Sequence, residues 1–220
     1  MPTPVRSPWL QIPLADYEAH MALPDVGQAL ALSDELRISL RQSRPQSLAL
    51  AGCAGGNGLE VVAALAASTD PRDRSIRRIA CIDINPHYVA AVGTRYAERV
   101  PGLELHVADL GVGVPQCPPV ELVFAGLLLE YVELGAALAT LRALCTAGGR
   151  VVVVSQSPDT TRPAVTPSPY RSLAVLAGHM TLRDPATLIA NATVAGFHVD
   201  ELRVRDLPGG KRFDVTTLRG

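Results

Sequence analysis

The sequence predicts an α/β domain with a seven-stranded, mostly parallel β-sheet that ends in an antiparallel hairpin. Three observations lead to this prediction. Between residues 47 and 155, short apolar runs alternate with helical stretches, as in parallel sheets covered on both faces. A glycine-rich segment, Gly52–Gly58, directly follows the first apolar run. Residues 197–218 instead alternate apolar and polar side chains around Pro208-Gly209-Gly210, which is typical of a hairpin.

The composition indicates one continuous apolar core and disfavours a polyanionic partner. Of the 220 residues, 48% are hydrophobic and 19% charged, and the formal net charge is −1, so global disorder is not expected. Basic residues occur in pairs, as at Arg77–Arg78 and Lys211–Arg212, and these are too short for a nucleic-acid surface. No stretch approaches about 18 uninterrupted apolar residues, so we expect no membrane span.

The four cysteines are expected to be reduced core thiols. They lie far apart in the chain and form no Cys-x-x-Cys pair, so neither a disulfide framework nor a zinc site is expected. The opening Met-Pro-Thr-Pro lacks the basic and then apolar pattern of a secretory signal peptide. We therefore expect a cytoplasmic protein without a bound metal.

Residues 1–45 are expected to form an N-terminal arm and two cover helices. Four prolines within residues 1–13 favour an extended arm. Helices are expected over 14–21 and 25–43, the second ending at Arg44–Pro45. In that second helix, five residues recur at helical spacing: Val26, Leu30, Ser33, Leu36 and Leu40.

Residues 46–156 are expected to alternate strands and helices. The predicted strands are the apolar runs 47–51, 77–83, 103–108, 120–125 and 150–155. The predicted helices are 59–67, 86–99 and 134–145, the second opened by Pro86 at its first turn. Gly148–Gly149 are expected to turn the chain into the fifth strand, whose β-branched run Val151–Val154 is expected to be fully buried.

Residues 157–195 are expected to form an insert that contains two helices, and residues 196–220 the terminal hairpin. The insert is rich in proline over 157–169, and helices are expected over 170–179 and 184–195. The hairpin strands are expected over 197–205 and 212–218. Together these elements predict a Rossmann-like, doubly wound sheet in one domain that spans residues 1–220.

The glycine-rich turn is the clearest sign of a binding site. Without a Cβ, the backbone at Gly52 can turn tightly and let a ligand approach closely. A helix that begins near Asn57 would direct its unpaired N–H groups and its positive dipole end toward that ligand.

Two acidic residues end the next two strands, at the same edge of the sheet as the turn. Asp83 ends the second strand, where its carboxylate can accept both hydroxyls of a ribose. The alternative is that Asp83 caps the helix that starts near Pro86. Asp109 ends the third strand in the same way and can hold an adenine amino group, although a role as a turn cap has nearly equal weight.

Residues 47–125 resemble the cofactor half of class I S-adenosylmethionine-dependent methyltransferases. The segment LALAGCAGGNGLE is similar to their first motif, IACIDINPHYVAAV to their second, and ELHVADL to their adenine-binding segment. ELVFAGLLLEYV and LCTAGGRVVVV are similar to the segments of strands four and five, and the terminal hairpin extends the likeness to about 45–220. PWLQIPLADYEAHM resembles the opening of a group of small, functionally undescribed bacterial methyltransferases.

The resemblance implies S-adenosylmethionine as the cofactor and names the residues that would hold it. These are Gly52, Cys53, Ala54, Asn57, Asp83, Ile84, Asp109, Leu110 and Gly126. Two positions depart from the family pattern: Leu50 replaces the usual acid, and Ala54 replaces a common glycine. The methionine ammonium then needs another acceptor, either Glu130 or carbonyls near Gly126. Leu50 also admits a chain that binds the cofactor weakly or without chemistry.

The glycine spacing also fits short-chain dehydrogenases, which need a Tyr and a Lys four residues apart. The only lysine is Lys211, and the nearest preceding tyrosine is Tyr170, so this pair is absent. The sequence also lacks the Gly-Lys-Ser/Thr of a P-loop.

Residues on the acceptor side are expected from the cover and from the ends of strands four and five. Methyl transfer is an in-line displacement, so alignment can supply much of the acceleration and a base is not obligatory. Tyr17, His20 and Glu130 are the candidates, although Tyr17 and His20 share a helical face with Met21 that would also suit simple packing. Glu130 would alternatively be a helix-start acid.

Other residues have two possible roles each. Trp9, the only tryptophan, would line a pocket or anchor the arm, and anchoring is favoured. Ser155 and Gln156 end the fifth strand and would face the acceptor or form a turn. His179 is expected at the surface near a helix end.

The expected function is methyl transfer to a small molecule, with an acceptor and an oligomeric state that the sequence does not indicate. A protein or nucleic-acid methyltransferase and a non-catalytic cofactor-binding module are the alternatives. Segments 14–43 and 157–180 are expected to close over the site and exclude water. The prolines of the insert predict that it is more mobile than the sheet when the site is empty.

Overall fold

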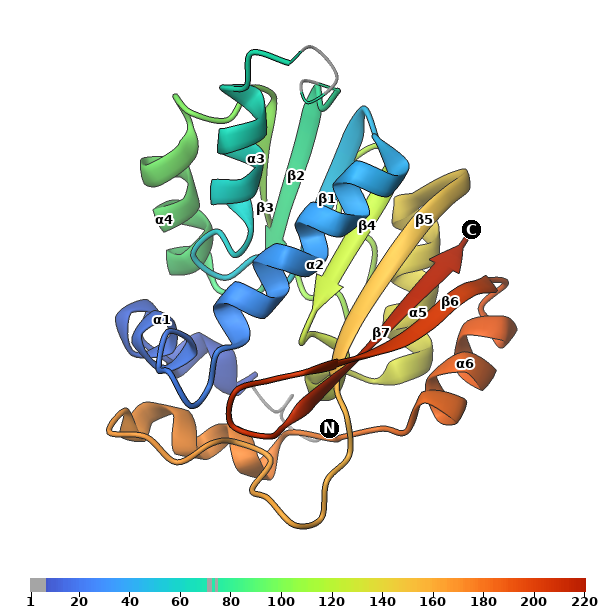
Figure 1. Cartoon of the computed structure of the whole chain (residues 1–220). Helices are drawn as coiled ribbons and strands as arrows, with labels where there is room; N and C mark the ends of the chain where they lie inside the picture. Colours follow the sequence, from blue (N-terminus) through green and yellow to red (C-terminus); the bar gives the residue numbers. More distant parts are fainter. Residues whose placement is uncertain (1–6, 71–72, 74) are drawn as a thin grey trace, which may run out of the picture.

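Seven strands form one sheet in the order β3-β2-β1-β4-β5-β7-β6 (Figure 1). The structure is a computed structural model that describes residues 7–70, 73 and 75–220. The five parallel strands are β1 (Ser47–Ala51), β2 (Arg78–Asp83), β3 (Leu103–Val107), β4 (Val120–Gly126) and β5 (Cys145–Gln156). The antiparallel strands are β6 (His198–Asp206) and β7 (Arg212–Arg219). The predicted mostly parallel sheet with an antiparallel terminal hairpin is confirmed.

The strand order reverses between β1 and β4. From β1 the chain builds outward through β2 to β3, and it then returns to place β4 on the other side of β1. The loops after β1 and β4 therefore diverge at the carboxyl end of the sheet, where doubly wound folds bind their ligands.

The helices cover both faces of the sheet because neighbouring strand residues point to opposite sides. Leu48 and Leu50 belong to one apolar core, and Ala49 and Ala51 belong to the other. The first core includes residues of α2 (Gln28–Ser43), α3 (Leu59–Ala66) and α4 (Pro86–Tyr96). The second includes residues of α5 (Leu134–Leu144) and α6 (Pro185–Val194). Figure 1 shows α2 lying across the first face.

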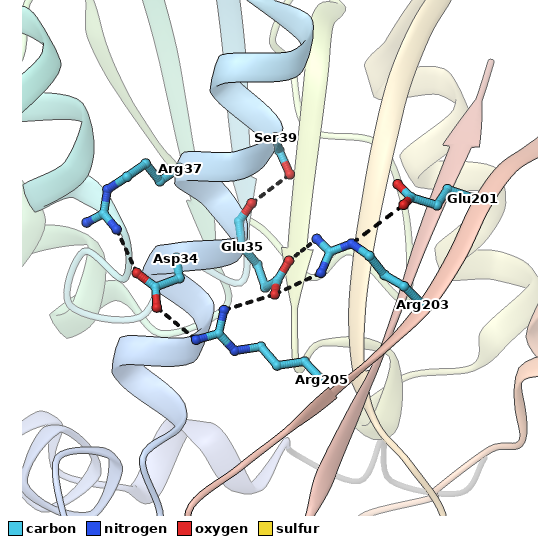
Figure 2. Close-up of polar contacts among 7 residues, drawn as sticks. All are labelled: Asp34, Glu35, Arg37, Ser39, Glu201, Arg203 and Arg205. Atoms are coloured by element: carbon cyan, nitrogen blue, oxygen red, sulfur yellow. Dashed lines mark hydrogen bonds and ion pairs between the residues drawn. The ribbon is translucent and has the colours of Figure 1, made fainter.

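A buried ion-pair cluster joins α2 to the hairpin. The Glu35 carboxylate is fully buried and pairs with both Arg203 and Arg205 of β6 (Figure 2). Arg205 also bridges to Asp34 at 2.8 Å. The two arginines satisfy a carboxylate whose burial would otherwise be costly.

The prediction of which residues of α2 face the core is partly wrong. The ion-pair cluster turns Glu35 inward and so sets the rotation of the helix about its axis. Leu30 is 77% exposed, and the helix begins at Gln28 after Gly27 takes a left-handed backbone conformation, so Val26 is buried outside it. The buried residues of the helix are Gln28, Ala31, Leu32, Glu35, Leu36, Ser39 and Leu40. Spacing of apolar residues does not reveal a buried ion pair.

The expected cover lies at the carboxyl end of the parallel strands (Figure 1). It contains the 3-10 turn η1 (Pro8–Gln11), helix α1 (Leu14–Met21) and the 3-10 helix η4 (Arg171–Gly178). The Ser172 hydroxyl donates to the Asp16 carboxylate at 2.6 Å, which ties η4 to α1. The prediction of an extended arm is wrong for Pro8–Gln11, and residues 1–6 lie outside the described part.

Strand β5 begins earlier than predicted. Cys145 already pairs with Val120, and the register then shifts before Arg150 pairs with Leu122. Gly148, with φ +75°, lies in this irregular stretch, where its N–H donates to the Gly220 carbonyl. The predicted glycine turn is therefore a bulge within the strand.

The four cysteines all lie in the described part, and all are free. Cys53, Cys81 and Cys145 are buried, as predicted. Among the described residues, no helix is both long and apolar enough to cross a bilayer.

Candidate functional site

A cavity of about 340 Å³ opens at the carboxyl end of the sheet, where the strand order reverses. We call it the main cavity. Its walls come from the loops that follow β1, β2, β3 and β4, together with residues of the cover. The residues at these strand ends and in these loops are Gly52, Ala54, Asp83, Ile84, Ala108, Asp109, Leu110, Gly111, Val112, Gly126, Leu127, Leu128, Val132 and Glu133.

Asp83 holds the glycine-rich turn against the end of β2. One carboxylate oxygen accepts the Ala54 N–H at 2.8 Å, and the other accepts the Asn85 N–H at 2.9 Å. Burial raises the pKa of Asp83, while these N–H donors oppose the increase. Each oxygen keeps a lone pair for a further donor, and the side chain lines the main cavity.

Asn85, and not Asp83, is the residue that caps helix α4. The Asn85 side chain accepts the N–H of His87 at 2.9 Å and thereby caps α4. Pro86 occupies the first turn of this helix, as predicted.

Several N–H groups of the glycine-rich turn donate hydrogen bonds to carbonyls within the turn. Those of Gly56 and Asn57 donate to the Cys53 carbonyl, and that of Leu59 donates to the Gly56 carbonyl. The expectation that a helix starting near Asn57 aims unpaired N–H groups at a ligand is therefore corrected: α3 starts at Leu59. The part of the turn that lines the main cavity is Gly52 and Ala54.

Close packing explains the later glycines of the turn. A Cβ on Gly56 would approach Tyr96 to 2.5 Å, and one on Gly58 would approach Leu36 to 2.5 Å. Ala54 takes the left-handed region with φ +46°, a conformation that a glycine adopts more easily.

Two residues predicted to bind the cofactor point elsewhere. Cys53 is 1% exposed and belongs to the apolar core. The Asn57 side-chain amide donates to the Tyr17 hydroxyl at 2.6 Å. Neither is among the residues that line the main cavity.

Asp109 caps a turn, as one of its predicted roles required, and also lies at the site. It lines the main cavity, and one of its carboxylate oxygens accepts the Gly111 N–H at 2.9 Å. Leu110, Ile84 and Gly126 line the same cavity.

Leu50 lies in the core, where the family pattern has an acid. It is 2% exposed and pairs in the sheet with Cys81 and Phe124. A third acid, which the sequence reasoning missed, lines the main cavity at Glu133. Glu133 caps α5 by accepting the N–H groups of Gly135 and Ala136, which lowers the pKa of its carboxyl.

Glu130 is buried behind the site and lines neither of the two cavities around the cover. One carboxylate oxygen accepts the Gln156 N–H at 2.7 Å, and the other has no hydrogen-bond partner among the described residues. Burial raises the pKa of Glu130 to about 7. The expectation that this side chain points into the closed space is corrected: it fixes the end of β5.

A smaller cavity of about 50 Å³ lies beneath the cover and borders the main one. We call it the inner cavity. Tyr17, His20 and Met21 line it from the buried face of α1, as their spacing predicted, and Gln156 lines it from the end of β5. The other lining residues are Trp9, Gln28, Leu127, Tyr131, Ala164, Val165, Thr166, Leu173, Leu176, Met180 and Lys211.

An aromatic cluster forms the border between the two cavities. Trp9, Tyr17 and Tyr131 line both. The ring of Trp9 meets those of Tyr17 and Tyr131 edge-on, with centroids 5.6 Å and 5.0 Å away. Burial raises the pKa of both tyrosines, so their hydroxyls are neutral at physiological pH. Trp9 therefore lines a pocket and also anchors the arm, because it packs against the apolar core and its carbonyl accepts the Asn85 side-chain amide at 2.9 Å.

The two remaining candidates, Ser155 and His179, differ in whether they line a cavity. Ser155 lines neither cavity, whereas His179 lines the main cavity although it is exposed. Its Nδ1 lies 3.0 Å from the Val175 carbonyl. Within the described part of the chain, no group of three or more His, Cys, Asp or Glu residues is arranged to hold a metal.

The chain has the fold of class I S-adenosylmethionine-dependent methyltransferases. It is similar to the magnesium protoporphyrin IX methyltransferase of Synechocystis, which was solved with bound S-adenosylhomocysteine. The two chains share 13% identity at TM-score 0.65, and the match covers 93% of this chain and 92% of that one. A methyltransferase of Mesorhizobium loti shares 15% identity at TM-score 0.57, over 80% of this chain and 91% of that one.

The same fold also occurs in a protein described as a [4+2]-cyclase. It shares 14% identity at TM-score 0.60, over 84% of this chain and 80% of that one. Identities this low show the fold alone. No protein-family model and no curated protein sequence matches the chain.

Proposed function

We propose that the protein transfers the methyl group of S-adenosylmethionine to a small-molecule acceptor. The observation that carries the proposal is the position of Asp83, which lines the main cavity while it holds the glycine-rich turn at Ala54. The Synechocystis methyltransferase with the same fold was solved with S-adenosylhomocysteine, and its named substrate is a small molecule. Residues 1–220 then form one methyltransferase domain, and the four free cysteines suit the cytoplasm.

The residues of the main cavity fit this cofactor in three places. Asp83 has a free lone pair on each carboxylate oxygen for the ribose hydroxyls. Asp109 offers an acceptor for the adenine amino group, and Ile84 and Leu110 offer apolar surface for the adenine ring. Since Leu50 is apolar and Glu130 is turned away, the carbonyls near Gly126 are the remaining predicted acceptors for the methionine ammonium.

The bound cofactor supplies an electrophilic methyl group on a sulfonium sulfur. The residues of this chain have the task of aligning the acceptor and excluding water, which can supply much of the rate. Tyr17 and Tyr131 would orient the acceptor between the two cavities with their neutral hydroxyls. His20 is the candidate base, because burial lowers its pKa and leaves its ring neutral at pH 7. Glu130 would act indirectly, by fixing Gln156.

The test is conversion of S-adenosylmethionine to S-adenosylhomocysteine in the presence of a small-metabolite extract. We expect the purified protein to release S-adenosylhomocysteine with the extract and far less without it. His20→Gln should reduce the release if the acceptor must lose a proton. Binding of S-adenosylhomocysteine without turnover in any metabolite fraction would contradict methyl transfer to a small molecule.

A non-catalytic cofactor-binding module is the second candidate, and Leu50 favours it. The Leu50 side chain, which stands where the family has an acid, is buried in the core. Leu50→Glu or Leu50→Asp would place the acid back at this position. Turnover by the wild-type protein would rule the module out.

A further inference from the structure

Lys211 is a buried cation without a carboxylate hydrogen-bonded to it in the described part of the chain. It is the only lysine of the sequence and is 9% exposed. Its ammonium donates to the Ala164 carbonyl at 2.6 Å and lies 3.5 Å from the Gln156 side-chain oxygen, and both are neutral acceptors. Asp159, whose charge also acts on Lys211, is itself paired with Arg162 at 3.1 Å.

The other side chains that line the inner cavity with Lys211 offer further donors but no carboxylate. His20 is 6% exposed, and its Nδ1 has no hydrogen-bond partner among the described residues. The Gln28 amide lies 3.4 Å from the Gln156 side-chain oxygen. All four residues line the inner cavity. The rest of its wall is mainly apolar or aromatic and includes Met21, Val165, Leu173, Leu176 and Met180.

A buried ammonium is costly unless an opposite charge compensates it. Burial lowers the pKa of Lys211 to about 8, and the charge of Asp159, which is paired with Arg162, opposes this decrease only in part. The protein leaves about 50 Å³ of space beside this group. A carboxylate is small enough for that space, and it would accept hydrogen bonds from Lys211 and from a ring N–H of His20.

We propose that the inner cavity binds the carboxylate end of the methyl acceptor and that Lys211 pairs with it. This inference rests on the proposed methyl transfer and narrows the acceptor to a small carboxylic acid. The body of the acid would pass the ring of Trp9 and reach the main cavity between Tyr17 and Tyr131, so an apolar or aromatic body fits best. Its far end, remote from the carboxylate, would be the end that receives the methyl group. In this arrangement His20, which lines the inner cavity and not the main one, binds the carboxylate and does not act as the base.

Trp9 provides a direct reporter, because the only tryptophan of the chain lines both cavities. Fluorescence titrations would compare 3-phenylpropanoate with 3-phenylpropanamide, which has the same shape without the charge. We expect the acid to bind the wild-type protein at least about tenfold more tightly, the size of one charge-assisted hydrogen bond. Lys211→Met should abolish this preference, and Lys211→Arg should retain part of it.

Arg212→Met is the matched control. Arg212 is adjacent in the sequence and is also cationic, but it is exposed and lines neither cavity, so its removal should leave the preference unchanged. Equal binding of the acid and the amide to the wild-type protein would overturn the proposal, as would no binding of either at millimolar concentration. A preference that persists in folded Lys211→Met would also overturn it.

Calorimetry with S-adenosylhomocysteine on the same proteins separates this proposal from the proposed function. Lys211 does not line the main cavity, so Lys211→Met should bind S-adenosylhomocysteine as the wild type does, which also shows that the variant is folded. If neither the wild type nor any variant binds S-adenosylhomocysteine, the cofactor assignment fails. The preference for the acid over the amide can still be measured in that case. If all bind it and the acid has no advantage, only the carboxylate site fails.

Discussion

The side-chain amide of Asn57 donates a hydrogen bond to the Tyr17 hydroxyl across 2.6 Å, joining the glycine-rich turn to the helix that covers it. Arg95 of α4 strengthens the same junction, because it pairs with Glu18 of α1 and donates to the Gly55 carbonyl at 3.1 Å. Helix α1 is thus anchored to the turn. The mobility of the insert over 157–169 stays a prediction, and in this structure Lys211 and Gln156 both donate to its Ala164 carbonyl.

Tyr17→Phe removes the contact between α1 and the turn. We expect the free energy of unfolding to fall by about 0.5–1.5 kcal/mol, the usual contribution of one hydrogen bond. Tyr17 itself lines the main cavity, whereas Asn57 does not, so Asn57→Ala, which removes the same hydrogen bond, should leave the affinity for S-adenosylhomocysteine unchanged. Urea denaturation measures the first quantity and calorimetry the second.

Tyr170→Phe is the control for this variant, because it removes the same hydroxyl from a half-buried tyrosine next to η4. A double-mutant cycle with Asn57→Ala isolates the pair. Additive effects of Tyr17→Phe and Asn57→Ala would show that the hydrogen bond does not hold the junction.

Glu130→Gln should change how stability depends on pH. Burial raises the pKa of Glu130 to about 7 in the folded protein, whereas the unfolded chain has an ordinary value near 4.3. Folding therefore favours the protonated carboxyl, and its contribution is present below about pH 4.3 and is lost as pH rises through 7. Between pH 4.3 and pH 8 we expect the free energy of unfolding of the wild type to fall by up to about 3 kcal/mol relative to that of Glu130→Gln.

Urea denaturation from pH 3 to pH 8 measures this difference. Glu133→Gln is a control of opposite sign, because N–H donors lower the pKa of Glu133, so its contribution is present at neutral pH and lost in acid. A constant difference between wild type and Glu130→Gln across the range would show that Glu130 titrates normally.

The insert should become resistant to proteolysis when ligand binds. Residues 157–169 connect β5 to η4, and Ala164, Val165 and Thr166 line the inner cavity, so closure over an occupied site should protect them. Trypsin is unsuitable because Arg162 precedes Pro163, and a protease of broad specificity is needed. Cleavage should slow with S-adenosylhomocysteine; unchanged cleavage with demonstrated binding would mean that the insert is not a lid.

Glu35→Gln should destabilise the contact between α2 and the hairpin. The variant leaves Arg203 and Arg205, each less than one-third exposed, without their shared carboxylate. We expect a loss of about 2–4 kcal/mol, below the upper values for fully buried pairs.

Asp200→Asn removes an ion pair from the same hairpin as a control. Asp200 pairs with Arg219, whose side chain is 52% exposed, so the cost should stay under about 1 kcal/mol. Equal losses in Glu35→Gln and Asp200→Asn would contradict the special role of the buried cluster.

The sequence predicted most of the sheet because its strands are nearly continuous apolar runs, and burial on both faces requires that pattern. It also predicted Asp83 at the carboxyl end of β2 and the shared face of Tyr17, His20 and Met21. These features depend on spacing along one segment, which a sequence shows directly.

The rest depends on contacts between distant segments. The spacing of apolar residues predicted that Leu30 faces the core. Instead, Glu35 faces inward and pairs with arginines about 170 positions later, and this rotation of α2 exposes Leu30. Glu130 follows the right strand, but its carboxylate bonds the backbone of Gln156. Lys211 lies in the terminal hairpin, and its place in the inner cavity follows only from the fold. That it is the sole lysine was the one available signal.

Calorimetric titration with S-adenosylhomocysteine, compared with NAD, tests the cofactor assignment most directly. We expect the wild type to bind S-adenosylhomocysteine more tightly, and Asp83→Ala to lose about 10–100-fold in affinity, or roughly 1.5–3 kcal/mol. Asp206→Asn, an exposed aspartate at the end of β6, should bind as the wild type does. Tighter binding of NAD, or an unchanged affinity in Asp83→Ala, would contradict the account.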